Sequence, residues 1–588
     1  MYFDLSGYIE YLEAKNELIR IHEFVNPELE IAEVVERISK IRTKGKEGGK
    51  ALLFLNTGTD FPVLINAFGS DNRVKAALGL SDINDIPAEI DLLFKRISSP
   101  KANLWDKLKL LPTLRHISYW FPKVVKMQSP SCQEVVMPSP KLSNLPILKC
   151  WPHDGGRFIT LPLVHTKDLE TGLRNVGMYR LQIFDDATTG MHWHRHKTGA
   201  KHFESYKKAK KLMPVAVTLG GDPAYTWCAA APLPENVDEY LFAGFLRKYP
   251  VRLVKCLTQD IEIPEDSDFV IEGYIDPSEA FAAEGPFGDH TGFYSLTEIY
   301  PKMHVTCITH RKGAVYPATV VGIPPQEDTY ISKAIETIFL KPIQMLIAPE
   351  ITDLYLPKEG VCHNIAIIAI EKTYPGQAIK IANAMWGAGQ MMFCKVIIVV
   401  DSNVDTHSAS GVMSAMGKHW HPSMDTYFTK GPLDVLDHAA RQPGFGGKLC
   451  IDATKKMPEE ESLFALQTVD KTYIFCNEDN IPATKAKLTV IFDRETDLSD
   501  FETCLWIATS NIDAAYDCTV ENNSLTVDAR TKFKTKDFHR PWPNVICMDD
   551  ATINAIDEKW EKLGLGKFIQ SPSLKYKHLV KSNGAQMN

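Results

Sequence analysis

One candidate chemical group consists of an arginine and two acids. Glu284 and Asp289 flank a Gly-Pro-Phe-Gly turn whose glycines permit a tight bend and whose proline stiffens it. Two carboxyl groups held close together cannot both ionise cheaply, so the pattern predicts that one of them donates a proton near neutral pH. Arg180 offsets one negative charge and has the forked geometry that binds a carboxylate. The alternative interpretation is an ordinary turn with two solvated acids.

A second group has the donor atoms of a metal site. Asn175 offers an amide oxygen, His196 an imidazole nitrogen and Glu239 a carboxylate. A single protein charge leaves a divalent cation such as Mn²⁺ or Mg²⁺ partly neutralised, so a phosphate group can complete its coordination. Taken singly, Asn175 also fits the cap of a turn, and Glu239 also fits the exposed face of a helix over residues 235–246.

Three histidines alternate with other residues in the middle of the chain. On a β-strand, His192, His194 and His196 project from one face, which brings a zinc site into consideration. Side chains at consecutive positions on one face of a strand diverge, so three ligands seldom come from such a run. We therefore expect one ligand, His196, with His192 and His194 in supporting or surface roles.

Composition excludes several classes of protein. The 588 residues are too many for one core and predict three or four domains. A net charge of −8 argues against nucleic acid as a partner, and the basic stretch over residues 201–211 is interpreted as a solvated helix face. The twelve cysteines include no C-x-x-C pair, which favours reduced thiols in a cytoplasmic protein. No signal peptide or membrane-spanning run is evident, although an apolar substrate would favour peripheral membrane contact.

The elements that must hold these groups indicate an α/β multidomain fold. Residues 1–125 are expected to form an N-terminal α/β domain, with a helix over 28–41 and a buried strand over 51–55. Closely spaced strand signals over residues 126–325 are typical of a barrel or sandwich. This middle region contains every candidate residue named so far.

Helices and strands alternate again in a C-terminal α/β domain, residues 326–457. Its apolar, β-branched runs suit parallel strands that are covered on both faces. Residues 458–533 form an inserted segment with a strand over 488–492, and residues 534–588 form a C-terminal helix and tail. No internal repeat is evident. The glycine-rich stretches lack the spacing of a phosphate loop or a dinucleotide fingerprint, and there is no G-x-S-x-G motif.

Several motifs in order resemble the UbiD family of prenylated-FMN-dependent (de)carboxylases over most of the chain. They include Asn175-Val-Gly-Met-Tyr-Arg180, Glu239-Tyr-Leu-Phe-Ala-Gly244, Glu284-Gly-Pro-Phe-Gly-Asp-His-Thr-Gly292 and Asp452-Ala-Thr454. The resemblance implies prenylated FMN as cofactor, with Mn²⁺ (or Mg²⁺) and K⁺ at its phosphate, and a flavin prenyltransferase as its supplier. It also implies that the middle region is a split β-barrel related to flavin reductases. The C-terminal domain would then serve a homo-oligomer, either a dimer or a hexamer.

The resemblance also implies roles for single residues. The metal ligands would be Asn175, His196 and Glu239, and the catalytic group would be Arg180, Glu284 and Asp289. Thr160 is similar to a residue that lies near the cofactor, and Lys395 is expected to reach the cofactor from the C-terminal domain. Cofactor binding would therefore involve six residues: Thr160, Asn175, Arg180, His196, Glu239 and Lys395. Asp289 is favoured as the proton donor; quinone-pathway members carry Asp at this position and ferulic-acid-type members carry Glu.

The expected function is the non-oxidative decarboxylation of a hydroxylated aromatic carboxylic acid in quinone biosynthesis. By analogy, the substrate is a dihydroxynaphthoate of the menaquinone route, with 3-polyprenyl-4-hydroxybenzoate of the ubiquinone route as the alternative. A flavin reductase on the same barrel and a non-catalytic scaffold are the competing classes. The segment over residues 458–533 is absent from the shorter quinone-pathway enzymes, so its role stays open.

Overall fold

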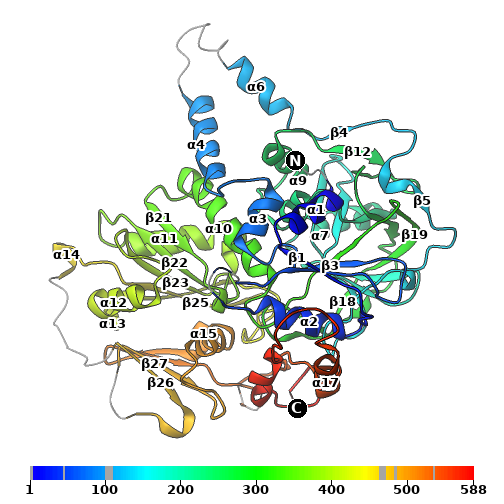
Figure 1. Ribbon diagram of the computed structural model, residues 1–588. Coiled ribbons are helices and arrows are strands. Elements are labelled where there is room, and N and C mark those ends of the chain that lie inside the picture. The colour runs from blue at the N-terminus through cyan, green and yellow to red at the C-terminus, as the bar shows by residue number, and fades with distance from the viewer. Residues whose placement is uncertain are drawn as a thin grey trace. The chain divides into compact units, whose positions relative to one another are not determined.

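The chain passes three times between two units of the computed structural model. The first unit comprises Met1–Ile331 and Ile546–Lys577, and the second comprises Ser332–Val545 and His578–Asn588. The structure describes residues 4–43, 45, 47–99, 110–461, 472–482, 486–533, 535 and 537–587. The long segment Ser332–Val545 of the second unit is therefore inserted in the sequence of the first unit, and His578–Asn588 follows it; the colours of Figure 1 mark the order along the chain.

A four-stranded sheet begins the first unit. Its strand order is β1 (Leu18–Ile21), β2 (Ala51–Phe54), β3 (Val63–Ile65) and β20 (Tyr316–Ala318). The helices of this region are α1 (Leu5–Ala14), α2 (Glu30–Ser39), α3 (Asp71–Leu78), α4 (Asp85–Ser98) and α6 (Leu111–Ser118). Every residue of β2 is buried, and α2 lies within the helix expected over residues 28–41, so both predictions are confirmed.

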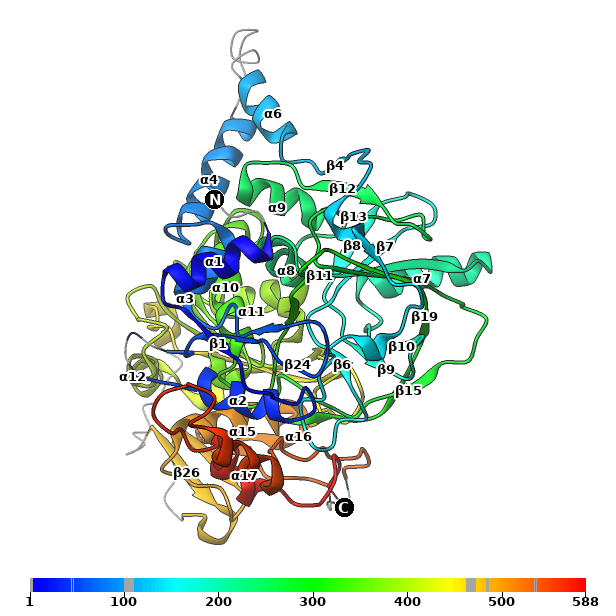
Figure 2. The ribbon, with the colours of Figure 1, turned by 45° about the vertical axis from the view of Figure 1, so that its right-hand side comes forward.

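A nine-stranded antiparallel sheet forms the middle of the first unit and has the shape of a half-barrel (Figure 2). Its order is β6 (Phe158–Ile159), β9 (Leu181–Ile183), β10 (Thr188–Met191), β19 (Lys302–His310), β14 (Phe269–Ile275), β11 (Met213–Leu219), β7 (Leu163–Lys167) and β8 (Arg174–Gly177), with β5 (Val135–Val136) beside β19. A smaller sheet has the order β13 (Glu262–Pro264), β12 (Arg252–Lys255) and β4 (Lys123–Val124). Two hairpins pair β15 (Ala282–Glu284) with β18 (Glu298–Tyr300) and β16 (Phe287–Gly288) with β17 (Tyr294–Ser295).

The helices of the middle region are α7 (Thr198–Ala209), α8 (Pro223–Ala230) and α9 (Glu239–Arg247). Near the end of the chain, α17 (Asp550–Lys559) returns to the first unit and packs against α2 (Figure 2). The buried Arg37 on α2 pairs with Asp557 at 2.6 Å, and Glu30 pairs with Lys559 at 2.7 Å. Two ion pairs thus join the beginning of this unit to its last helix.

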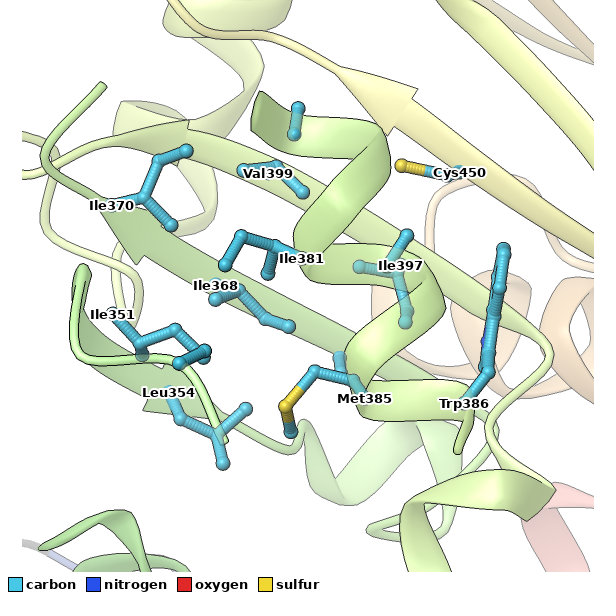
Figure 3. Packing of buried hydrophobic residues seen from close by; sticks show 14 of the residues in the cluster. Ile351, Leu354, Ile368, Ile370, Ile381, Met385, Trp386, Ile397, Val399 and Cys450 are labelled. Atoms are coloured by element: carbon cyan, nitrogen blue, oxygen red, sulfur yellow. The ribbon is translucent and has the colours of Figure 1, made fainter. Parts of the chain in front are cut away.

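A five-stranded sheet is the centre of the second unit. Its order is β21 (Ile351–Tyr355), β22 (Ile365–Ile370), β23 (Val396–Asp401), β25 (Phe445–Asp452) and β24 (Thr426–Pro432). The helices around it are α10 (Glu327–Leu346), which crosses the unit boundary, α11 (Gln377–Trp386), α12 (Ala409–His419) and α13 (Pro422–Asp425). Figure 3 shows Ile381 and Met385 of α11 packed against Ile368 and Ile397 of the sheet. The parallel pairing of β22 with β23 confirms the buried strands that the apolar runs predicted.

A four-stranded sheet follows in the same unit. Its order is β26 (Tyr473–Asn477), β27 (Leu488–Phe492), β29 (Ser524–Asp528) and β28 (Cys518–Glu521), and its helices are α14 (Pro458–Glu461), α15 (Phe501–Ser510) and α16 (Ala514–Asp517). The strand expected over residues 488–492 is confirmed as β27. All twelve cysteines are free thiols. In the part of the chain that the structure describes, no helix has both the length and the apolar character needed to cross a bilayer.

Candidate active site

Arg180, Glu284 and Asp289 come from three separate elements and meet in the first unit. Arg180 directly precedes β9, Glu284 ends β15 and Asp289 follows β16. Nε of Arg180 donates to Oε1 of Glu284 at 2.9 Å, and Nη2 donates to Oε2 at 3.2 Å. Nη1 donates to Oδ2 of Asp289. The guanidinium therefore lies between the two acids that the sequence singled out.

The hairpin of β16 and β17 fixes the plane of the guanidinium. Nη2 of Arg180 donates to Oγ of Ser295 at 2.8 Å, and the guanidinium carbon lies 4.6 Å from the ring centroid of Phe287. Phe287 and Ser295 are paired across the hairpin, so the two contacts come from neighbouring positions. An aromatic face under a guanidinium adds a cation–π attraction to the ion pairs.

Arg180 favours the ionised form of both acids in this arrangement, without a substrate present. Burial raises the pKa of Glu284, but Arg180 and His192 outweigh burial and hold this pKa at about 2. Burial also raises the pKa of Asp289, yet Arg180 and His290 hold it well below its usual range. The reason is that a cation stands between the carboxylates and offsets the repulsion that their spacing predicted.

A buried loop clamps the turn between the two acids. Asp154 accepts the N–H of Trp151 at 2.9 Å through Oδ2 and the N–H of Gly288 at 2.7 Å through Oδ1. The N–H of Gly155 donates to the carbonyl of Pro286 at 2.7 Å. A β-carbon on Gly288 would lie 2.2 Å from Cδ1 of Trp151, so the close approach of the indole requires glycine here.

The three histidines lie beyond the strand on which the sequence placed them. β10 ends before His192, and the chain from there to His196 forms a loop and a turn that lead into α7. The neighbouring strand β19 begins at Lys302, opposite Gly190, and the other neighbour, β9, begins at Leu181, opposite Met191, so neither strand continues beside the chain that follows His192. The assumption that the histidines share one face of a strand was therefore wrong.

The histidine rings nevertheless connect the two candidate groups. Nδ1 of His192 lies 2.9 Å from Oε2 of Glu284, and Nε2 of His192 lies 2.9 Å from Nε2 of His194. The ring centroids of His194 and His196 are 5.6 Å apart. A line of imidazoles thus runs from the acid beside Arg180 to His196.

Asn175 and Glu239 approach each other where β8 meets the start of α9. Oε2 of Glu239 accepts the backbone N–H of the residue after Asn175 at 2.9 Å. The hydroxyl of Tyr179 accepts from the Asn175 side chain and from the N–H of Gly199 in α7, each at 3.4 Å. Burial raises the pKa of Glu239 to about 7. These contacts tie together the segments that carry Asn175, Glu239 and His196.

A zinc-like cluster gains no support from the geometry. Among the described residues, no group of three or more His, Cys, Asp or Glu side chains is arranged to hold a metal ion. The set of Asn175, His196 and Glu239 contains an amide and is not a cluster of that kind. Its amide, imidazole and carboxylate donors suit Mn²⁺ or Mg²⁺ with a phosphate as a further ligand.

The two remaining candidate residues have different surroundings. The register of β6 with β9 pairs Ile159 with Leu181, so its continuation places Thr160 opposite Arg180. Lys395 belongs to the second unit, where its ammonium pairs with Asp437 at 3.0 Å and donates to the carbonyls of residues 510 and 512. These three partners use all three N–H donors of the lysine.

Sequence reasoning missed several residues that position the site. Gln182 accepts the N–H of Gly285 at 2.7 Å and so holds the turn between the acids. The ring of Tyr300 lies 4.4 Å from the ring of His192. Ser295 and Tyr300 reach the site through hairpin pairing, for which the sequence carries no local signal. Gln182 was detectable in principle, because it lies in β9 only two residues after Arg180.

Three family models match the chain. They describe the N-terminal domain (residues 9–92), the Rift-related domain (residues 123–324) and the C-terminal domain (residues 329–453) of 3-octaprenyl-4-hydroxybenzoate carboxy-lyase. The chain belongs to the UbiD family. Arg180, Glu284, Asp289 and the histidine line all lie within the central UbiD match, whereas residues after 453 lie outside all three models.

Relatives and solved structures agree with membership of the UbiD family. An uncharacterized protein of Aquifex aeolicus is 47% identical over 78% of this chain and 93% of its own length, and one of Helicobacter pylori strain J99 is 34% identical over 98% and 99%. Vanillic acid decarboxylase of Sedimentibacter hydroxybenzoicus in closed form has a TM-score of 0.68 at 28% identity, covering 80% of this chain and 96% of its own. The UbiD-class enzyme HmfF of Pelotomaculum thermopropionicum shares the fold, with a TM-score of 0.64 at 24% identity over 79% and 97% of the two chains. The UbiD-family chain is a carboxy-lyase.

Proposed function

We propose that this carboxy-lyase removes CO₂ from a hydroxylated aromatic carboxylic acid of quinone biosynthesis, with prenylated FMN as its cofactor. The observation that carries the proposal is the Arg180 group, which is joined through a line of imidazoles to the region of Asn175, His196 and Glu239. The likeness to a vanillic acid decarboxylase supports an aromatic acid as substrate. Solved structures of HmfF hold FMN and prenylated FMN, which supports the cofactor.

The donor set fits a flavin phosphate and its cations. Asn175, His196 and Glu239 would hold Mn²⁺ or Mg²⁺ at the phosphate, with K⁺ beside it, and Thr160 would contact the cofactor near Arg180. When bound, prenylated FMN supplies the electron sink that an aryl carbanion requires. We leave Lys395 outside the cofactor-binding set, because its three donors are already used within the second unit.

The charges of the site suggest how the proton is supplied. Decarboxylation replaces the carboxylate by hydrogen, so each turnover consumes one proton. A substrate carboxylate that enters beside Arg180 adds a third negative charge to those of Glu284 and Asp289, and this charge raises the pKa values of both acids. We assign the resulting proton to Asp289, which then donates it to the ring carbon after CO₂ departs. Arg180 orients the substrate and afterwards stabilises Asp289 as a carboxylate again.

For the substrate we favour a dihydroxynaphthoate of the menaquinone route, with 3-polyprenyl-4-hydroxybenzoate as the alternative. For the fold we extend the proposal to a flavin-reductase-like split barrel, of which the half-barrel sheet would be the cofactor-binding part. A flavin prenyltransferase would be the partner that supplies the cofactor.

Co-expression with a flavin prenyltransferase tests the proposal. The purified protein should show a flavin absorption spectrum, the intact mass of prenylated FMN and release of CO₂ from one or more acids in a panel of hydroxybenzoates and hydroxynaphthoates. A protein that purifies without flavin would indicate a scaffold. A flavin that is bleached by NAD(P)H, without CO₂ release from any acid, would identify a flavin reductase.

A further inference from the structure

Two sheets of the second unit have the same strand plan. In the order β22-β23-β25-β24, the first two pairings are parallel and the third is antiparallel. The order β26-β27-β29-β28 repeats this pattern of two parallel pairings and one antiparallel pairing. In each sheet a long helix and then a short helix follow the second strand, α12 and α13 in one and α15 and α16 in the other. Residues 365–456 and 473–532 therefore share one topology.

Pairs of an aspartate and a lysine occupy matching positions in the two segments. Asp425 accepts a backbone N–H from four residues earlier at 2.7 Å and pairs with Lys456 at 3.0 Å. Asp517 accepts the N–H from four residues earlier at 2.7 Å and pairs with Lys532 at 3.7 Å. Each lysine also donates to a carbonyl four residues before it, at 3.3 Å and 2.8 Å. Because they share this topology and these polar contacts, we call residues 365–456 the first copy and residues 473–532 the second copy.

The two copies contact each other reciprocally. Lys395, before β23, donates to the carbonyl of Ile512, after α15, at 3.0 Å. Lys487, before β27, donates to the carbonyl of Trp420, after α12, at 2.8 Å. The same spacing separates the two lysines and the two carbonyls in the sequence. In the same way, α16 packs against β24 and β25, while α13 packs against β28 and β29.

A second exchange of contacts repeats the pattern. The N–H of Ser423 donates to Oδ1 of Asn523 at 3.3 Å, and the N–H of Asn523 donates to Oγ of Ser423 at 3.1 Å. The matching contact, with the two copies exchanged, joins Gly447 to Ala515: a β-carbon on Gly447 would lie 2.8 Å from Cβ of Ala515. In an isologous interface, residue i of one copy contacts residue j of the other, and residue j of the first copy contacts residue i of the second. Two identical subunits form such an interface across a two-fold axis.

We propose that residues 473–532 are a built-in second copy that pairs with residues 365–456 of the same chain, in the place where another subunit would bind. The partner that fits the α12 and α13 surface is a second copy of the same fold, and the chain itself supplies that copy. This surface is therefore closed to a neighbouring chain, and any homo-oligomer forms through a different face.

The parts that the second copy retains agree with a pairing role. In the first copy, α11 covers the sheet and contributes Ile381 and Met385 to its core (Figure 3). Among its described residues the second copy has no counterpart of α11, since β27 follows β26 after a short connection. The second copy has both helices that reach the first copy: α16 packs against β24 and β25, and the carbonyl of Ser510 at the end of α15 accepts from Lys395. In its described residues the second copy thus has the helices that pair with the first copy, but not a counterpart of α11, the helix that covers the sheet in the first copy.

An engineered disulfide tests the pairing directly. A β-carbon on Gly417 of α12 would lie 3.7 Å from Cβ of Thr472, which directly precedes β26, and this separation suits a disulfide. In the full-length variant Gly417→Cys with Thr472→Cys, oxidation should give a bridged single chain on a non-reducing gel and no covalent dimer. The solution mass by light scattering should equal that of the wild type. A covalent dimer, two free thiols after oxidation, or a wild-type oligomer that dissociates on bridging would each overturn the proposal.

Two further variants control the experiment. Gly387→Cys with Thr472→Cys should not form a bridge, because a β-carbon at Gly387 has only carbonyl oxygens of its own helix within 4 Å. Ser423→Cys with Asn523→Cys tests the same pairing at another contact between the copies, in case the first variant does not fold. A bridge within one chain supports the proposal, and a bridge between chains overturns it.

Discussion

Arg180 and Glu284 share two hydrogen bonds, at 2.9 and 3.2 Å, and Glu284 is completely buried. Asp289 bonds to a single nitrogen of the same guanidinium and keeps 7% of its surface exposed. The two acids are therefore unequal. Glu284 anchors the arginine, whereas Asp289 can leave it at smaller cost, and this difference supports Asp289 as the acid that carries the proton.

Replacing Arg180 by lysine should lower kcat/KM by about a hundredfold, which is the cost of misplacing a substrate by about 1 Å. Lysine keeps the charge but cannot form the fork to Glu284 or present a plane to the substrate. Flavin absorbance should remain, because Arg180→Lys leaves the metal ligands intact. The matched control is Arg195→Lys at an exposed position, which should keep normal rates of CO₂ release. Normal rates in Arg180→Lys would remove the arginine from substrate binding.

In the variant Asp289→Asn, the turnover rate should fall by a factor of about 10² to 10⁴, which is the usual contribution of a general acid. The amide retains the size of the side chain but has no acidic proton to give, so flavin content should not change. Steady-state CO₂ release, measured with flavin absorbance on one sample, checks both statements. Asp185→Asn, in an exposed turn, serves as the control and should be active.

Removing the imidazole of His196 should cost the protein its divalent metal and its flavin together. The variant is His196→Ala, and metal per chain is measured by elemental mass spectrometry after co-expression with the prenyltransferase. The histidine His407 is exposed and lies in the second unit, so His407→Ala should retain both. Full metal occupancy in His196→Ala would exclude this residue from the ligand set.

The clamp behind the catalytic turn should not accept a methyl group. In Gly288→Ala the new β-carbon meets the Trp151 ring at 2.2 Å, so the indole or the turn must move. We expect a loss of about 1–3 kcal/mol in the free energy of unfolding, the usual cost of overpacking, and weaker catalysis. At Gly387 a β-carbon has only ordinary contacts, beginning at 3.5 Å, so Gly387→Ala should change neither property. Urea unfolding and CO₂ release measure the two effects.

A buried glutamate in the second unit should make stability depend on pH. Burial raises the pKa of Glu336 to about 8, although its carboxylate accepts the N–H of Leu356 at 2.6 Å. Because the folded pKa is above the unfolded value, this group contributes stability below about pH 4.5, and the contribution is lost as pH rises to about 8.

Glutamine at this position does not titrate, so Glu336→Gln should gain stability over the wild type between pH 5 and pH 9, on the order of a few kcal/mol. Urea unfolding at both pH values provides the measurement. The exposed Glu371→Gln should differ from the wild type by the same amount at both pH values. A difference for Glu336→Gln that also stays constant with pH would contradict the assignment.

Local patterns predicted the elements, and the turn between Glu284 and Asp289 predicted that the two acids approach each other. The sequence analysis expected Arg180 to offset one negative charge, but the spacing of the acids does not reveal that both of them bind the same guanidinium. The loop at His192 was also missed. Alternation predicts a strand only where a partner strand continues beside it, and both partners of β10 stop there, β19 at Lys302 and β9 at Leu181.

The internal copy was invisible in the sequence for a different reason. A sheet tolerates many apolar side chains at each buried position, so β23 and β27 share a pattern but few letters. The common feature of the two copies is a small set of polar contacts, such as those of Lys395 and Lys487. These contacts can be recognised as equivalent only when the structure shows which elements the two lysines reach.

The backbone N–H of Ile546 donates to the carbonyl of Gly292 at 3.0 Å, three residues beyond Asp289. This contact and α17 are encoded after Ser332–Val545, the long segment of the second unit. During translation the ribosome must therefore make Ser332–Val545 before the first unit can be completed, and until then the surfaces of the first unit that α17 covers stay exposed. A premature stop codon directly after residue 545 would release a polypeptide that keeps Ser332–Val545 but lacks this contact and α17, and its catalytic half would be a target for chaperones and proteases.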